Sequence, residues 1–69
     1  NKMQTNVQVN LISGIDSALR AVTMLRRKGI KFYEISIYSN SLSLIIPIET
    51  ESIVRAQLSK LSDIEVLVN

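Results

Sequence analysis

Residues 18–37 carry the pattern that most limits how this chain can fold, because a helical periodicity changes there into a strand-like composition with almost no loop between them. The apolar residues that share one side of the predicted helix are Ala18, Ala21, Val22 and Leu25, with Leu19 at the margin, while Arg20, Thr23 and Arg27 lie opposite. Basic residues at 26–28 suit the C-terminal end of a helix dipole, and Gly29 can adopt the left-handed conformation that ends a helix. β-Branched and aromatic residues follow at 30–37. We therefore predict a helix that ends on a glycine and leads directly into a strand.

The alternation of apolar residues changes phase within this predicted strand. Ile30 and Phe32 share one parity, whereas Ile35 and Ile37 share the other. An extra residue in one strand of a pair shifts the face of every residue that follows it. We therefore predict a β-bulge near residues 33–34.

The rest of the chain divides into further elements. Residues 4–11 alternate apolar and polar side chains, which predicts a strand buried on one face. A short polar turn precedes a strand expected at 42–48 and makes a hairpin of it and the strand before it. A second helix at 51–61 and a last strand at 64–68 follow. Proline cannot donate to a ladder, so we place Pro47 at the end of its strand or on an unpaired side.

Polar residues are placed at the starts of both helices. Ser13 and Asp16 have the spacing of a capping box before the first helix, and Thr50 can cap the second. We expect one face of the second helix to contact the core through Ile53, Val54, Leu58 and Leu61.

The order strand–helix–strand–strand–helix–strand predicts an α+β fold. With right-handed crossovers it gives a ferredoxin-like βαββαβ sandwich, in which a four-stranded antiparallel sheet carries two helices on one face. Residues 1–69 form a single predicted domain, because no linker or low-complexity stretch interrupts them. This topology puts the strand after the first helix at an edge of the sheet.

The composition predicts that the chain associates. A chain of 69 residues buries only about 60% of its unfolded surface, yet 46% of its residues are hydrophobic and no cysteine is present to form a disulfide. We expect a second copy or a larger partner to cover part of that surface. The edge strand offers an unpaired ladder with apolar side chains, so the candidate dimer-interface residues are Tyr33, Ile35, Ile37 and Tyr38.

The residue inventory argues against several other functions. Without His or Cys, and without a serine beside a base, we predict no enzyme activity, no metal site and no cofactor. Basic residues at 26–28 with Lys31 could touch phosphate, but helix-end charges explain them more simply, and we expect no nucleic-acid partner. No apolar run approaches the ~20 residues that span a bilayer, so we expect a cytoplasmic protein with no membrane partner.

Two stretches resemble a known family. Residues 25–35, Leu-Arg-Arg-Lys-Gly-Ile-Lys-Phe-Tyr-Glu-Ile, and residues 57–66, Gln-Leu-Ser-Lys-Leu-Ser-Asp-Ile-Glu-Val, are similar to ACT domains. They resemble in particular the small regulatory subunit of acetohydroxyacid synthase (acetolactate synthase). The resemblance implies a homodimer that joins two four-stranded sheets and docks on the catalytic subunit, a thiamine-diphosphate enzyme of branched-chain amino acid biosynthesis.

The resemblance also implies an amino-acid effector site, held between the first strand–helix turn of one copy and the second strand of its mate. Its candidate residues here are Ser13, Gly14, Ile15, Asp16 and Lys31. Where the family has a glycine, Asp16 adds a negative charge close to the expected effector carboxylate. We therefore expect the response to a branched-chain amino acid effector to be weakened or lost. A free-standing ACT module that binds a small amino acid is the alternative interpretation.

Overall fold

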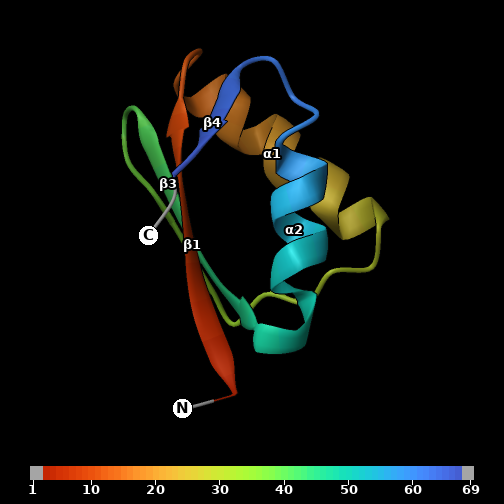
Figure 1. Ribbon diagram of the computed structural model, residues 1–69. Helices are drawn as coiled ribbons and strands as arrows, with labels where there is room; N and C mark the ends of the chain where they lie inside the picture. The colour runs from red at the N-terminus through yellow and green to blue at the C-terminus, as the bar shows by residue number, and fades with distance from the viewer. Residues whose placement is uncertain (1–2, 68–69) are drawn as a thin grey trace.

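A four-stranded antiparallel sheet with two helices on one face forms the structure, a computed structural model that describes residues 3–67 (Figure 1). The elements in chain order are β1 (Gln4–Leu11), α1 (Ile15–Arg27), β2 (Glu34–Ile37), β3 (Ser41–Pro47), the short 3-10 helix η1 (Ile48–Thr50), α2 (Glu51–Leu58) and β4 (Ile64–Val66). The strand order β2-β3-β1-β4 is ferredoxin-like. The predicted fold class is therefore confirmed, including the edge position of β2.

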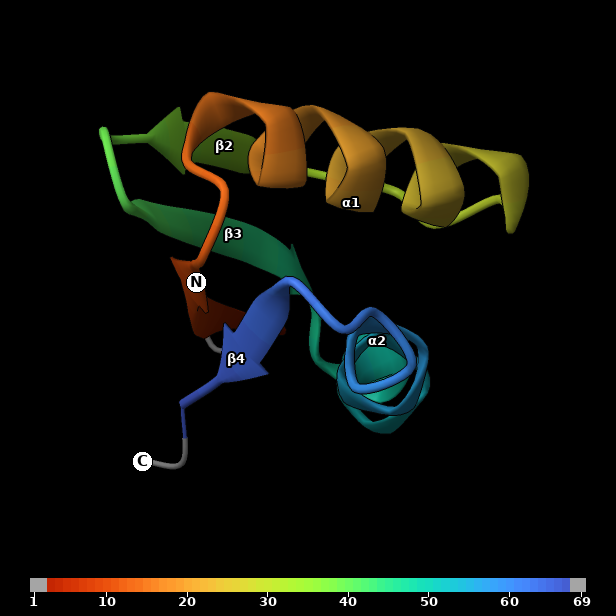
Figure 2. The same cartoon turned by 90° about the horizontal axis from the view of Figure 1, so that it is seen from above.

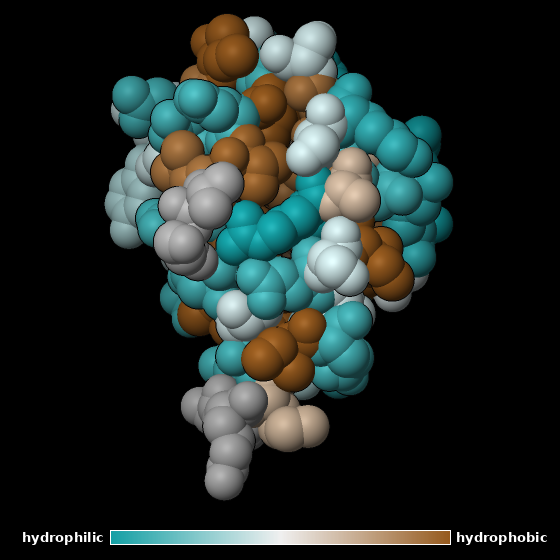
Figure 3. Space-filling view, in the orientation of Figure 1, coloured by the Kyte–Doolittle hydropathy of each residue, from teal (hydrophilic) through white to brown (hydrophobic). Residues whose placement is uncertain are grey.

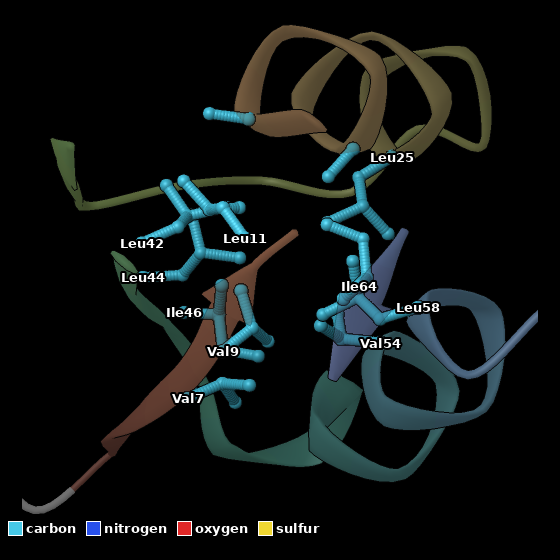
Figure 4. Close-up of a cluster of buried hydrophobic side chains, with 12 residues drawn as sticks. Val7, Val9, Leu11, Leu25, Leu42, Leu44, Ile46, Val54, Leu58 and Ile64 are labelled. Carbon is cyan, nitrogen blue, oxygen red and sulfur yellow. The ribbon is translucent and has the colours of Figure 1, made fainter. Parts of the chain in front are cut away.

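The core lies between the sheet and the helices (Figure 4). Odd-numbered residues of β1 and even-numbered residues of β3 face the helices, as the alternation predicts. The buried hydrophobic residues are Val7, Val9, Leu11, Ala18, Ala21, Leu25, Leu42, Leu44, Ile46, Val54, Leu58 and Ile64. Small residues on the inner side of α1 let this helix approach the sheet closely, and Leu25 fills the space near its end.

The other face of the sheet is polar. Asn6 donates to the Ser43 hydroxyl over 2.9 Å, and Asn10 donates to the Glu65 carboxylate over 3.1 Å. These cross-strand pairs lie on exposed side chains, so the sheet has one buried and one solvated face. Within residues 3–67, neither helix is long and apolar enough to cross a membrane.

The predicted bulge is present, but the strand around it is shorter than expected. The backbone N–H of Tyr33 donates to the Ile45 carbonyl over 2.8 Å, and Glu34 is also the register partner of Ile45. Two residues that oppose one are the mark of a β-bulge. Residues 30–32 lie outside the strand because Ile30 and Phe32 pack against the core instead of continuing the ladder.

Several predicted boundaries and faces are wrong. The second helix ends at Leu58 rather than 61, since residues 59–63 form turns that lead into β4. Ile48 leaves the strand for η1, and Ile53 is 51% exposed rather than buried. Val54 and Leu58 alone occupy the fully buried face of this short helix, with Leu61 partly buried behind them. The last strand covers 64–66, and residue 68 lies outside the described part of the chain.

Candidate effector turn and association surface

The turn between β1 and α1 depends on Gly14. Its φ of 61° and ψ of −135° are accessible to glycine but strained for other residues. A Cβ at this position would lie 3.2 Å from the carbonyl oxygen of Ser39 in the β2–β3 hairpin. The hairpin is also tied to the end of β1, because the Leu11 N–H donates to the Asn40 carbonyl over 2.9 Å. The turn is therefore packed against the hairpin by backbone contacts.

The predicted capping box is wrong. Gly14, not Ser13, is the N-cap residue of α1, and no side chain caps this helix end. Ser13 instead donates its backbone N–H to the Ser17 hydroxyl over 3.0 Å. Thr50 does occupy the N-cap position of α2, but its hydroxyl donates to the Pro47 carbonyl over 2.7 Å and caps no N–H. Ser13, through its backbone N–H, and Thr50, through its hydroxyl, thus stabilise turns rather than cap helix ends.

A buried polar network, not predicted from the sequence, holds the turn in place. Ser17 is fully buried and its hydroxyl donates to Asp63 Oδ2 over 2.9 Å. Arg20 forms an ion pair with the same oxygen, and the Asp63 carbonyl accepts the Ile12 N–H over 3.0 Å. The α2–β4 loop is thereby fastened to both sides of the β1–α1 turn. The sequence signal that could have predicted this network is Ser17, a serine on the apolar side of the helix, since a buried hydroxyl needs a hydrogen-bond partner.

The structure brings together four of the five candidate effector residues. Ser13, Gly14, Ile15 and Asp16 are contiguous at the start of α1, and Asp16 is exposed with no ion pair within residues 3–67. Lys31 lies beyond the other end of α1, where its ammonium group is 5.5 Å from the centre of the Tyr33 ring. A helix of 13 residues is about 20 Å long. Lys31 therefore cannot reach the turn of its own copy.

Two of the four candidate interface residues lie on β2 itself, which among residues 3–67 is hydrogen-bonded to a neighbouring strand on one side only. Ile35 pairs with Leu44 and Ile37 with Leu42, so both isoleucines point to the helix-covered face. Their β3 partners are fully buried, yet each isoleucine is 39% exposed. Apolar side chains of the core layer thus reach the surface at this edge.

Within residues 3–67, the backbone of β2 also has N–H groups at this edge that bond to no other strand. The Tyr38 N–H donates to the Ser41 carbonyl across the hairpin over 2.8 Å. Because successive N–H groups of a strand point to opposite sides, those of Ile35 and Ile37 point away from β3. Tyr33 and Tyr38 flank the strand and are 50% and 64% exposed. The edge therefore combines free ladder groups with apolar side chains.

The flank of α1 adds to this apolar edge. At about 100° per residue, Ile15 and Leu19 lie on the side of the helix away from Arg20 and its Asp63 partner, and they are 49% and 57% exposed. Figure 2 shows α1 next to β2, while α2 lies next to β4. On the opposite side of the molecule, with β4 and α2 in front, hydrophilic and hydrophobic groups are mixed (Figure 3).

No protein-family model, curated protein or solved structure compared with this chain matches it. Among residues 3–67, no group of three or more His, Cys, Asp or Glu side chains is arranged to hold a metal ion. The fold, the Gly14 turn and the β2 edge are the features from which a function can be argued.

Proposed function

We propose that this chain is a cytoplasmic, non-catalytic regulatory subunit of acetohydroxyacid synthase, built as an ACT domain. In this proposal it dimerises through β2, docks on the catalytic subunit and supports that subunit's activity in branched-chain amino acid biosynthesis. Its own response to an effector is weakened by Asp16.

The observation that carries the proposal is the open edge of β2. An uncovered strand with Ile35 and Ile37 exposed at 39% and outward N–H groups favours pairing with another chain over remaining free in water. The ferredoxin-like sheet and the two stretches at 25–35 and 57–66 support the ACT assignment. The lack of His and Cys in the sequence supports a non-catalytic role.

Antiparallel pairing of two β2 edges about a two-fold axis would also complete the candidate effector site. The start of the mate's β2 would then lie level with the end of the first β2, beside the hairpin that contacts Gly14. Lys31 precedes β2 by three residues, so the mate's Lys31 would approach the turn that carries Asp16. The five candidate residues would then come from two copies.

Reconstitution tests the proposed function. The purified chain is mixed with acetohydroxyacid synthase catalytic subunits, and the rate of acetolactate formation is measured with and without it. We expect a saturable increase in rate at a fixed ratio of the two chains, and co-elution of both. A chain that changes neither the rate nor the elution of any catalytic subunit in the panel is not a regulatory subunit of this enzyme.

A free-standing amino-acid-binding module is the second candidate, and the turn at Gly14 favours it. The backbone there is fixed by contacts with the hairpin, and the first N–H groups of a helix can bind the carboxylate of a small ligand. Titration calorimetry with branched-chain and other amino acids distinguishes the two functions. Micromolar binding by the chain alone, without stimulation of a synthase, would favour the module.

A further inference from the structure

A second surface of the molecule, which adjoins the apolar flank of the β2 edge at Leu19, combines cations with apolar groups. It is an open groove of about 660 Å³ along α1, lined by Leu19, Arg20, Thr23, Met24, Arg27 and Lys28. We call this surface the α1 groove. Most of its lining residues lie on the side of the helix opposite Ala18, Ala21 and Leu25, which face the core. The α1 groove is therefore directed away from the sheet.

Two cations of the α1 groove are not used by the fold. The ion pairs within residues 3–67 are Arg20 with Asp63 and Arg55 with Glu51, so Arg27 and Lys28 have no carboxylate partner there. Their position at the C-terminal end of the helix is favourable by a fraction of a kcal/mol only. Arg20, in contrast, is committed to Asp63.

Apolar side chains lie between and beside these cations. Met24, half-buried against the core, lies along the helix between Arg20 and the pair at 27–28, whereas Leu19, 57% exposed, flanks Arg20 on the side away from that pair. Single-stranded nucleic acid is bound by cations together with aromatic stacking platforms, and no aromatic residue lines the α1 groove. Alternating cations and aliphatic groups suit an acidic protein segment with apolar side chains between its carboxylates.

We propose that the α1 groove docks an acidic segment of the catalytic subunit, with apolar residues of that segment against Leu19 and Met24 and carboxylates against Arg27 and Lys28. This inference rests on the proposed function, since the partner is the synthase, and it goes beyond it by assigning the surface used. The β2 edge then serves the second copy and α1 serves the catalytic subunit.

Charge reversal with a matched control tests the docking surface. One double variant carries Arg27→Glu and Lys28→Glu; the control carries Arg26→Glu and Lys60→Glu. All four residues are exposed and without ion pairs within residues 3–67. Each double variant replaces two cations with two carboxylates, so the net charge changes equally. Binding to acetohydroxyacid synthase catalytic subunits is measured by interferometry, and circular dichroism checks folding. We expect the first variant to weaken binding at least about tenfold, and the control to change it less than about threefold.

A cross-linking measurement gives a second test that removes no charge. A photoreactive amino acid replaces Thr23, inside the α1 groove, or Ser52, exposed on α2. Irradiation of the mixture should link position 23, and not position 52, to a peptide of the catalytic subunit rich in Asp and Glu. A link from position 23 only to peptides without acidic residues would overturn the proposal.

Each outcome separates this inference from the proposed function. If the wild type binds and stimulates the synthase but both double variants bind alike, the α1 groove is not the docking surface and the regulatory role survives. If the wild type neither binds nor stimulates any catalytic subunit, both proposals fail. Salt-sensitive binding to a single-stranded oligonucleotide, lost in the first variant, would assign the α1 groove to nucleic acid instead.

Discussion

At the scale of single residues, the β1–α1 turn is fixed by the carboxylate of Asp63, which lies in the α2–β4 loop, and by Gly14 in the turn itself. Asp63 accepts the buried Ser17 hydroxyl and the Arg20 guanidinium on one oxygen, while its backbone holds Ile12. Gly14 allows the chain to turn within van der Waals distance of the hairpin. Asp63 thus holds the candidate effector turn from the α2–β4 loop, and Gly14 lets the turn pack against the hairpin.

Replacement of Asp63 with alanine should destabilise the chain. The buried Ser17 hydroxyl would lose its acceptor, and a group left unsatisfied in this way costs about 1–3 kcal/mol. Chemical denaturation at one fixed protein concentration measures the loss. Glu49→Ala, at an exposed carboxylate in η1, is the control and should change stability by less than about 0.5 kcal/mol. Equal effects of the two substitutions would contradict a structural role for the network.

The two glycines should differ in their tolerance of alanine. Gly14 and Gly29 both have positive φ, 61° and 79°, but only at Gly14 would a Cβ meet other atoms, at 3.2 Å. We expect Gly29→Ala to cost about 1 kcal/mol from backbone strain, and Gly14→Ala to cost at least about 2 kcal/mol because steric contact is added. Thermal unfolding of the two variants side by side measures the difference. The reverse order would show that the hairpin does not constrain the turn.

At the scale of elements, the periodicity of apolar residues predicted which faces of the strands and helices are buried, because local side-chain patterns control those faces. The alternation of β1 and β3 and the apolar arc of α1 correctly identified most of their buried residues, with Ile48 exposed and Ser17 missed, and the phase change between Phe32 and Ile35 correctly located the bulge. The length of α2 was wrong because the residues after Leu58 have helical character but leave the helix to reach β4. The Ser17–Asp63 contact joins residues 46 positions apart, which no local pattern reveals. Of the candidate site, the contiguous turn and the edge strand could be located, but not the network behind them.

The edge strand provides the prediction for this scale. Ile35→Lys should weaken self-association, because the ammonium group of the lysine must lie at the proposed pairing edge. The aliphatic part of the lysine side chain still covers the core of the unassociated chain. Sedimentation velocity over a range of concentrations should show the dissociation constant raised at least about tenfold relative to the wild type. Ile53→Lys, at a residue 51% exposed on α2, serves as the control and should leave it unchanged. If Ile35→Lys and the wild type have the same dissociation constant, β2 is not the dimer interface.

As a whole, the described part of this chain of 69 residues leaves several large hydrophobic side chains exposed, Ile35 and Ile37 among them. The network of Ser17, Arg20 and Asp63 fixes the β1–α1 turn, and this turn and the hairpin fix the direction of β2. β2 in turn brings outward N–H groups and two isoleucines to one edge of the sheet. With β2 used for a second copy and the α1 groove left for a larger partner, the proposed role needs no reactive side chain. In this proposal the function is association, and pairing through the sheet edge is its first step.

Amide hydrogen exchange of Ile35 and Ile37, measured by NMR over a range of protein concentrations, tests pairing through the β2 edge most directly. Their N–H groups point away from β3, whereas the neighbouring Ser36, paired with Ser43, serves as the internal reference. We predict that the two isoleucine amides are protected to a degree comparable with that of Ser36, because a second β2 accepts their hydrogen bonds. Free exchange of both isoleucine amides beside a protected Ser36, at every concentration, would contradict pairing through this edge.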